Sequence, residues 1–254
     1  MIGDVYGAAG RKTIMNRLTS LKAEKGINFI IVNAENIAHG VGINEKYYRE
    51  LLDLNVNVVT LGNHAFRNND IYNFIGDATA LVRPLNMPDG VPGRGYVTVR
   101  YNNVTITVFQ VMGRSFMNNP VDCPFTTTER LLNTVKSDLY ICDFHGEATS
   151  EKIAYGLYFD GKVNVIAGTH THVQTNDAHI LNKGTMYMTD LGMTGARDGV
   201  IGVNPEMIVK RFINGLPCRH YPMETGKMQL CGLIIDINEN THKVTNFEVI
   251  NIVQ

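Results

Sequence analysis

The sequence predicts an α/β fold, because short apolar runs rich in β-branched residues alternate with helix-like segments through its first two-thirds. After Met186 the chain becomes richer in strand-forming residues. No repeat, low-complexity tract or long linker divides the sequence, so we expect a single domain over residues 1–254. A chain of 254 residues with 44% hydrophobic content can bury a substantial core.

The local patterns define the expected elements in order. Apolar runs predict strands at residues 29–34, 56–61, 104–111, 139–144 and 163–167. Helices are expected at residues 11–25, 45–54, 69–75 and 128–136, the last with Thr126 and Glu129 as a capping box. Residues 84–95 contain three prolines and three glycines, which predicts an irregular connection between two halves of the fold. Residues 228–237 and 244–252 are expected to form a hairpin across Asn238-Glu239-Asn240.

Charge and cysteine content exclude several classes of protein. With 23 basic and 24 acidic residues, the chain has no electrostatic footprint for a long nucleic-acid duplex or an anionic membrane. The N-terminus has no signal-peptide pattern and no stretch approaches the roughly 18 apolar residues of a membrane span, so we expect a cytoplasmic protein. The widely spaced cysteines favour buried free thiols over a zinc ribbon or a disulfide framework: Cys123, Cys142, Cys218 and Cys231.

Side chains that can bind metals fall at the ends of four of these apolar runs and after Ile2-Gly3 at the N-terminus. These residues are Asp4, Glu35 with Asn36, Asn63 with His64, His145, and His170 with His172. Because ligands of open α/β sheets bind outside the carboxyl ends of the strands, such residues can converge although they are distant in sequence. Taken singly, Asn63 fits a turn, and Asp4 or Glu35 fits a helix cap. The same pattern at five strand ends favours a shared metal centre.

Strand geometry makes further predictions about these residues. An extended chain would place the imidazoles of His170 and His172 on one side, because strand side chains repeat every two residues. The same period places Asp143 beside His145, where it would orient the imidazole; a solvated aspartate is the alternative. Asp190 is expected in a similar supporting role. Ordinary surface or hydrogen-bonded histidines are expected at His39, His179, His220 and His242.

The types of ligand indicate which metals to expect. Carboxylates, amide oxygens and imidazoles without thiolate suit manganese or iron, with zinc possible, better than they suit a structural zinc site. Two such ions about 3.5–4 Å apart would bind phosphoryl oxygens and generate an attacking hydroxide. Glu35 is the candidate bridge, because its two carboxylate oxygens can serve two cations.

The sequence resembles the calcineurin-like metallophosphoesterase superfamily, and more closely the bacterial YmdB-type 2′,3′-cyclic nucleotide phosphodiesterase family. The resemblance spans essentially the whole chain and rests on an ordered set of motifs: Gly3-Asp4-Val5, Asn33-Ala34-Glu35-Asn36, Thr60-Leu61-Gly62-Asn63-His64, residues 143–152, residues 168–175 and residues 189–195. It implies a layered α/β/β/α sandwich. It also implies His64 as a catalytic residue and a set of metal ligands: Asp4, Glu35, Asn36, Asn63, His145, His170 and His172.

Several positions depart from the patterns of these families. The superfamily has Asp-x-His after its first strand, whereas the third position here is Tyr6, and Glu35 replaces the usual bridging aspartate. Arg67 stands where close relatives commonly have an acidic residue. Only Met1-Ile2-Gly3 precedes Asp4, so we expect either residues upstream of Met1 or an unusual neighbour that stabilises this strand.

The resemblance implies a hydrolase that cleaves a small phosphodiester, expected to be a 2′,3′-cyclic nucleotide, by attack of a metal-bound hydroxide. His64 would protonate the leaving oxygen, a contribution of about 10²–10⁴-fold. Arg94 and Arg114 are either phosphate ligands or ordinary loop arginines. The alternatives are a nucleotidase or phosphomonoesterase on the same metal centre, and a metal-containing regulatory protein that binds nucleotides. Relatives suggest self-association into a homo-oligomer.

Overall fold

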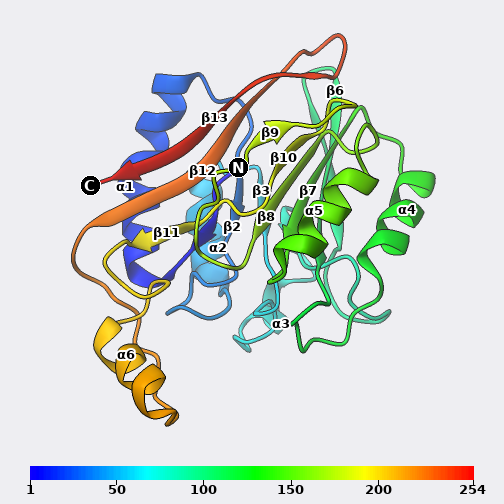
Figure 1. Cartoon of the computed structure of the whole chain (residues 1–254). Coiled ribbons are helices and arrows are strands. Elements are labelled where there is room, and N and C mark those ends of the chain that lie inside the picture. Colours follow the sequence, from blue (N-terminus) through cyan, green and yellow to red (C-terminus); the bar gives the residue numbers. More distant parts are fainter.

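Two β-sheets stack face to face and carry helices on their outer faces in the computed structural model, which describes residues 1–254 (Figure 1). On one side lie α1 (Gly7–Lys25), α2 (Glu45–Asp53) and α3 (Ile71–Phe74). On the other side lie α4 (Pro124–Thr134) and α5 (Thr149–Tyr158). The α/β/β/α sandwich expected from the sequence is confirmed.

The first sheet is assembled around the N-terminal residues. Its parallel part has the order β2-β3-β4, with β2 at Ile31–Asn33, β3 at Val58–Thr60 and β4 at Leu81–Val82. The remainder has the order β1-β11-β12-β13, with β1 at Asp4–Val5, β11 at Met193–Ala196, β12 at Met228–Ile237 and β13 at Val244–Val253. Ile2 joins the two parts, because it pairs in parallel with Val32 and antiparallel with Gly232. The residue before the short first strand is thus supported on both sides, by β2 and by β12, while β1 itself pairs in parallel with β11.

The second sheet has the order β5-β6-β7-β8-β10-β9. Its strands are β5 (Tyr96–Tyr101), β6 (Val104–Met112), β7 (Leu139–His145), β8 (Val165–Thr169), β9 (His179–Ile180) and β10 (Met186–Met188). Strands β6, β7, β8 and β10 run parallel, and their register aligns His145 with Met112 on one side and Thr169 on the other. The carboxyl ends of these strands therefore meet at one edge of the sheet.

Three apolar layers hold the sandwich together. Ile14 and Leu18 of α1 pack with Val59 of the first sheet. Between the sheets, Ile31 and Val58 pack with side chains of the second sheet, and the outer layer below α4 and α5 is built from Phe109, Cys142, Tyr155 and Phe159. The central strands are thus buried on both faces, which explains their continuous apolar runs.

One helix stands apart from the layers. Helix α6 (Pro205–Asn214) projects from the sandwich and exposes Phe212 and Ile213, while Ile208 packs against Tyr6 (Figure 1). None of the helices combines the length and apolar character that crossing a bilayer requires.

Several sequence predictions needed correction. Helix α4 begins at Pro124, four residues before the predicted start, because proline suits the first helical turn, where its missing N–H costs no bond. The capping box was wrong: the Thr126 hydroxyl donates to the carbonyl of Cys123 at 3.3 Å. Helices α5 and α6 were not predicted. Cys142 and Cys231 are buried thiols as expected, but Cys123 and Cys218 are only half-buried. The irregular residues 84–95 do connect the two sheets, from β4 to β5.

Candidate metal centre

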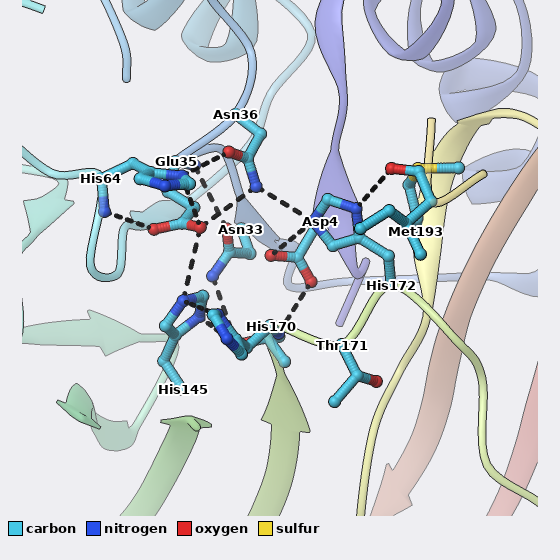
Figure 2. Close-up of polar contacts among 12 residues, drawn as sticks. Asp4, Asn33, Glu35, Asn36, His64, His145, His170, Thr171, His172 and Met193 are labelled. Carbon is cyan, nitrogen blue, oxygen red and sulfur yellow. Dashed lines mark hydrogen bonds and ion pairs between the residues drawn. The ribbon is translucent and has the colours of Figure 1, made fainter. Parts of the chain in front are cut away.

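The eight side chains singled out in the sequence meet in one polar cluster at the carboxyl ends of the strands (Figure 2). They come from both sheets: Asp4 from β1, Glu35 and Asn36 after β2, Asn63 and His64 after β3, His145 from β7, and His170 and His172 after β8. Gly62 permits this approach, since a Cβ atom there would collide with the Glu35 carboxylate and with Nε2 of His145. The convergence predicted from the strand ends is therefore present in the structure.

One half of the cluster surrounds Nε2 of His145. This atom lies 2.8 Å from Oδ1 of Asn63, 3.1 Å from Nδ1 of His170 and 3.3 Å from Oε1 of Glu35. Potential ligand atoms of Glu35, His145 and His170 all lie within 4.8 Å of one another. A single cation can reach all three of these residues.

The other half is formed by Asp4, Asn36 and His172. Nε2 of His172 lies 3.1 Å from Nδ2 of Asn36 and 3.8 Å from Oδ1 of Asp4. Nδ2 of Asn36 also lies 3.1 Å from Oε1 of Glu35. Glu35 therefore touches both halves of the cluster, which suits a carboxylate shared by two cations.

The orientation of His145 is fixed by Thr169 and Asp143. The hydroxyl of Thr169 donates to Oδ1 of Asp143 at 2.6 Å, and therefore accepts a hydrogen bond from Nδ1 of His145 at 2.8 Å. The other Asp143 oxygen accepts hydrogen bonds from Asn33, Thr60 and Gln110. With its proton held on Nδ1, a neutral His145 presents the lone pair of Nε2 to the cluster. The predicted supporting position of Asp143 is confirmed, although it acts through Thr169 and not by direct contact.

The expected extended conformation of His170 and His172 was wrong. Strand β8 ends at Thr169, and the φ angles of His170 and His172 are 103° and 65°. Residues other than glycine rarely adopt such positive φ values. Such values persist where surrounding contacts hold the backbone, often at functional sites. Here the amide of His170 donates to Oδ2 of Asp4 at 3.2 Å, and Nδ1 of His172 donates to the carbonyl of Ile201 at 2.9 Å. Both imidazoles thus reach the cluster from a turn and not from a strand.

Burial and mutual charge shift the pKa values within the cluster. Burial raises the pKa of the Asp4 carboxyl to about 6, despite the opposing charge of His172. Burial alone would lower the pKa of His145, but the charge and hydrogen bond of Glu35, together with the charges of Asp4 and Asp143, raise that pKa to about 9. Burial, together with the charge of His145, lowers the pKa of His170 to about 3. The buried carboxylates around His145 thus stabilise a positive charge inside the site.

The donor atoms fit bound cations. Oδ1 of Asp4 is buried and has no hydrogen-bond partner in the protein. Nε2 of neutral His145 faces oxygen and nitrogen lone pairs on three sides, an arrangement that is repulsive unless a proton or a cation lies between them. Oxygen and nitrogen donors without thiolate match the manganese or iron expected from the sequence, with zinc also compatible.

His64 lies at the edge of the cluster, where its side chain is 31% exposed. Its amide donates to Oε2 of Glu35 at 2.8 Å, and its Nδ1 lies 2.8 Å from Oδ1 of Asn36. Because an amide oxygen only accepts hydrogen bonds, Nδ1 carries a proton, and Nε2 makes no hydrogen bond within the protein. Arg67, Arg94 and Arg114 have exposed side chains that form no hydrogen bond to the cluster.

Sequence reasoning missed three supporting contacts. Oε2 of Glu147 lies 3.1 Å from Nε2 of His170, which leaves Nδ1 of that ring facing His145. Buried Lys152 forms an ion pair with Asp190, a residue that was expected in a supporting role. The ring of Tyr6 packs edge-on against His172, with centroids 5.4 Å apart. Both Glu147 and Lys152 fall in the motif at residues 143–152, which was the available signal.

The architecture is that of the metallophosphoesterases. It matches a solved 5′-nucleotidase from Staphylococcus aureus with a TM-score of 0.54, over 91% of this chain and 47% of the other, at 12% identity. That likeness shows the fold alone. A family model described as YmdB-like protein matches residues 1–250, and the chain belongs to this family.

Two relatives are similar over nearly their whole length. The chain is 44% identical to the 2′,3′-cyclic-nucleotide 2′-phosphodiesterase of Bacillus subtilis (strain 168), over 97% of this chain and 94% of the relative. A solved phosphatase from Mycoplasma pneumoniae superposes with a TM-score of 0.94 at 39% identity, covering 99% of this chain and 92% of the other. The family resemblance drawn from the sequence is confirmed.

Proposed function

We propose that this protein is a dinuclear metal-dependent phosphodiesterase that hydrolyses a small phosphodiester, namely a 2′,3′-cyclic nucleotide. The observation that carries the proposal is the buried convergence of carboxylate, amide and imidazole donors around Glu35, with His64 beside them. The substrate class is taken from the similarity to the Bacillus subtilis enzyme.

The ligands divide between two cations according to their distances. Asn63, His145 and His170 would hold one cation, because their donor atoms gather around Nε2 of His145. The other would be held by Asp4 and His172, with Asn36 contributing through Oδ1, the amide oxygen that also accepts from His64, and Glu35 would serve both. When bound, the two ions would activate the attacking water and offset the charge that develops on the phosphoryl oxygens.

The chain's own residues supply the remaining chemistry. Asn36 accepts the Nδ1 proton of His64 and so fixes the ring. In the imidazolium form of His64, Nε2 carries a second proton; it would pass this proton to the leaving ribose oxygen, which leaves the neutral ring with its proton on Nδ1. A ribose alkoxide leaves poorly without a proton, so this donation would contribute about 10²–10⁴-fold to the rate. The His64 side chain is partly exposed, so its ring can contact a substrate that enters from solvent.

Metal analysis combined with a turnover screen tests this proposal. We expect close to two transition-metal ions per chain, loss of activity with chelator, and recovery with manganese or iron. The screen compares 2′,3′-cyclic nucleotides, bis-phosphodiesters and phosphomonoesters, with the exposed His179→Ala as a matched histidine control. Full activity in metal-free protein would contradict the mechanism. Turnover of monoesters alone would favour a nucleotidase, and nucleotide binding without turnover would favour a regulatory protein.

The proposal extends to the setting of the enzyme. We infer a cytoplasmic protein with one folded domain over residues 1–254, acting as a homo-oligomer on a small nucleotide. Cell fractionation, the number of unfolding transitions and the mass in solution test these three points separately.

A further inference from the structure

A buried ion pair lies directly behind the polar cluster. Nζ of Lys152 in α5 is 2.8 Å from Oδ2 of Asp190, and both side chains are almost completely inaccessible to solvent. The other lysine and arginine ion pairs of the protein are partly exposed. Burying two opposite charges seldom stabilises a protein more than apolar residues of similar size would. Stability alone therefore does not account for this pair.

The hydrogen bonds of the pair converge on the backbone around His170. Nζ of Lys152 donates to the carbonyl of Thr169 at 2.8 Å, one residue before His170. Oδ2 of Asp190 accepts from the amide of Thr171 at 3.1 Å, one residue after it. The peptide groups on both sides of His170 are thus held by one ion pair.

Asp190 is itself held in place. Its Oδ1 accepts from the amide of Gly192 at 2.9 Å, and its amide donates to the hydroxyl of Thr175 at 2.9 Å. Close backbone packing reinforces this contact, since a Cβ atom on Gly168 would collide with the carbonyl of Thr189. The ion pair therefore connects a rigid segment to the turn that carries His170.

His170 needs such support because its backbone is in an unfavourable conformation. Its φ of 103° costs of the order of a factor of ten or more in conformer population for a non-glycine residue. Without the two hydrogen bonds, the turn would keep only the bond from the His170 amide to Asp4 and would relax toward ordinary backbone angles. Nδ1 of His170 would then move away from Nε2 of His145, which lies 3.1 Å away.

We propose that Lys152 and Asp190 are positioning residues that hold His170 in the geometry required to bind a cation. This inference rests on the proposed function, in which His170 is a metal ligand. Neither side chain of the pair makes a hydrogen bond to a side chain of the cluster, so the pair acts through the backbone of residues 169–171. Residues that orient ligands in this way commonly change metal affinity about 10–100-fold when they are replaced.

Manganese titration of Lys152→Met and Asp190→Asn by calorimetry tests the inference. We expect one of two binding sites to weaken about 10–100-fold while the other is unchanged, because His172 is held separately by Ile201. Excess manganese should restore turnover, which loss of folding would not allow. The matched control is Tyr155→Phe on the same helix, which loses a buried hydrogen bond to Thr128 (2.6 Å) and should bind manganese normally.

A second variant guards against misfolding. Either single substitution leaves a buried charge without its partner, whereas Lys152→Met/Asp190→Asn carries no buried charge. We expect this double variant to fold, as seen by circular dichroism, and to show the same weakened site. Unchanged affinity at both sites in folded variants would overturn the inference and leave the proposed function standing. Wild-type protein that binds no manganese would overturn both.

Discussion

The hydroxyl of Thr169 offers a direct test of how the metal centre is supported. It is fully buried, it is the only partner of Oδ1 of Asp143, and it accepts the Nδ1 proton of His145. Thr169→Val keeps the shape of the side chain and removes both hydrogen bonds, together with a longer one of 3.4 Å from Asn33, whose Nδ2 keeps its other partners. Two buried polar groups lose their partners, at a cost of roughly 1–3 kcal/mol each, so we expect about 2–6 kcal/mol of destabilisation.

The same substitution should weaken metal binding. Without Thr169, the ring of His145 is free to rotate or to change tautomer, and Nε2 no longer presents its lone pair reliably. We therefore expect about 10–100-fold lower manganese affinity. Urea unfolding of the metal-free protein measures the stability change, and calorimetric titration measures the affinity.

Thr185→Val is the matched control. Thr185 is equally buried, and its hydroxyl also makes two hydrogen bonds, to the carbonyl of Val163 (2.6 Å) and from the amide of Gly161 (2.8 Å). It lies before β10, at the end of the sheet opposite to the cluster. We expect it to lower stability but not metal affinity. Equal affinities for Thr169→Val and wild type, or equal losses in both variants, would refute the reasoning.

Two further predictions concern protons. The pKa of His145 is raised to about 9 in the metal-free protein, so below this pH a cation must displace the His145 proton. Manganese affinity should therefore rise from pH 7 to pH 9. Calorimetry in buffers of different ionisation enthalpy measures the released proton. Binding at pH 7 without proton release would contradict this. His64→Ala should lower turnover about 10²–10⁴-fold without metal loss, and less with a nitrophenolate leaving group. An equal defect for good and poor leaving groups would exclude a general acid.

The sequence predicted the location of the cluster better than its local geometry. Asp4, Asn63 and His145 were found because each comes at the end of an apolar run of the sequence, and parallel strands bring their carboxyl ends to one edge. The conformations of His170 and His172 could not be predicted in this way, because positive φ angles depend on contacts with distant residues such as Asp4 and Ile201.

The supporting residues were harder to recognise for a related reason. Lys152 lies on a helix, where lysines usually face solvent, and its partner Asp190 is 38 residues away. Helix α5 was overlooked because the residue before it, Ala148, provides no capping side chain. Packing against a sheet can stabilise a short helix without such a cap. Local pattern therefore identifies strand-end ligands but not the tertiary contacts that orient them.

The departure from the superfamily pattern at Tyr6 lies next to Asn36, because both side chains contact the imidazole of His172. Tyr6, at the position of the usual histidine, packs its ring edge-on against His172 and so supports a neighbouring imidazole from the side. The amide of Asn36 lies 3.1 Å from Nε2 of that same imidazole, which places an additional donor residue beside it. Asn36 also contacts Glu35 and His64, so one side chain connects both halves of the cluster to the proposed acid. Tyr6 and Asn36 thus contact the same imidazole, and Asn36 links that imidazole to His64.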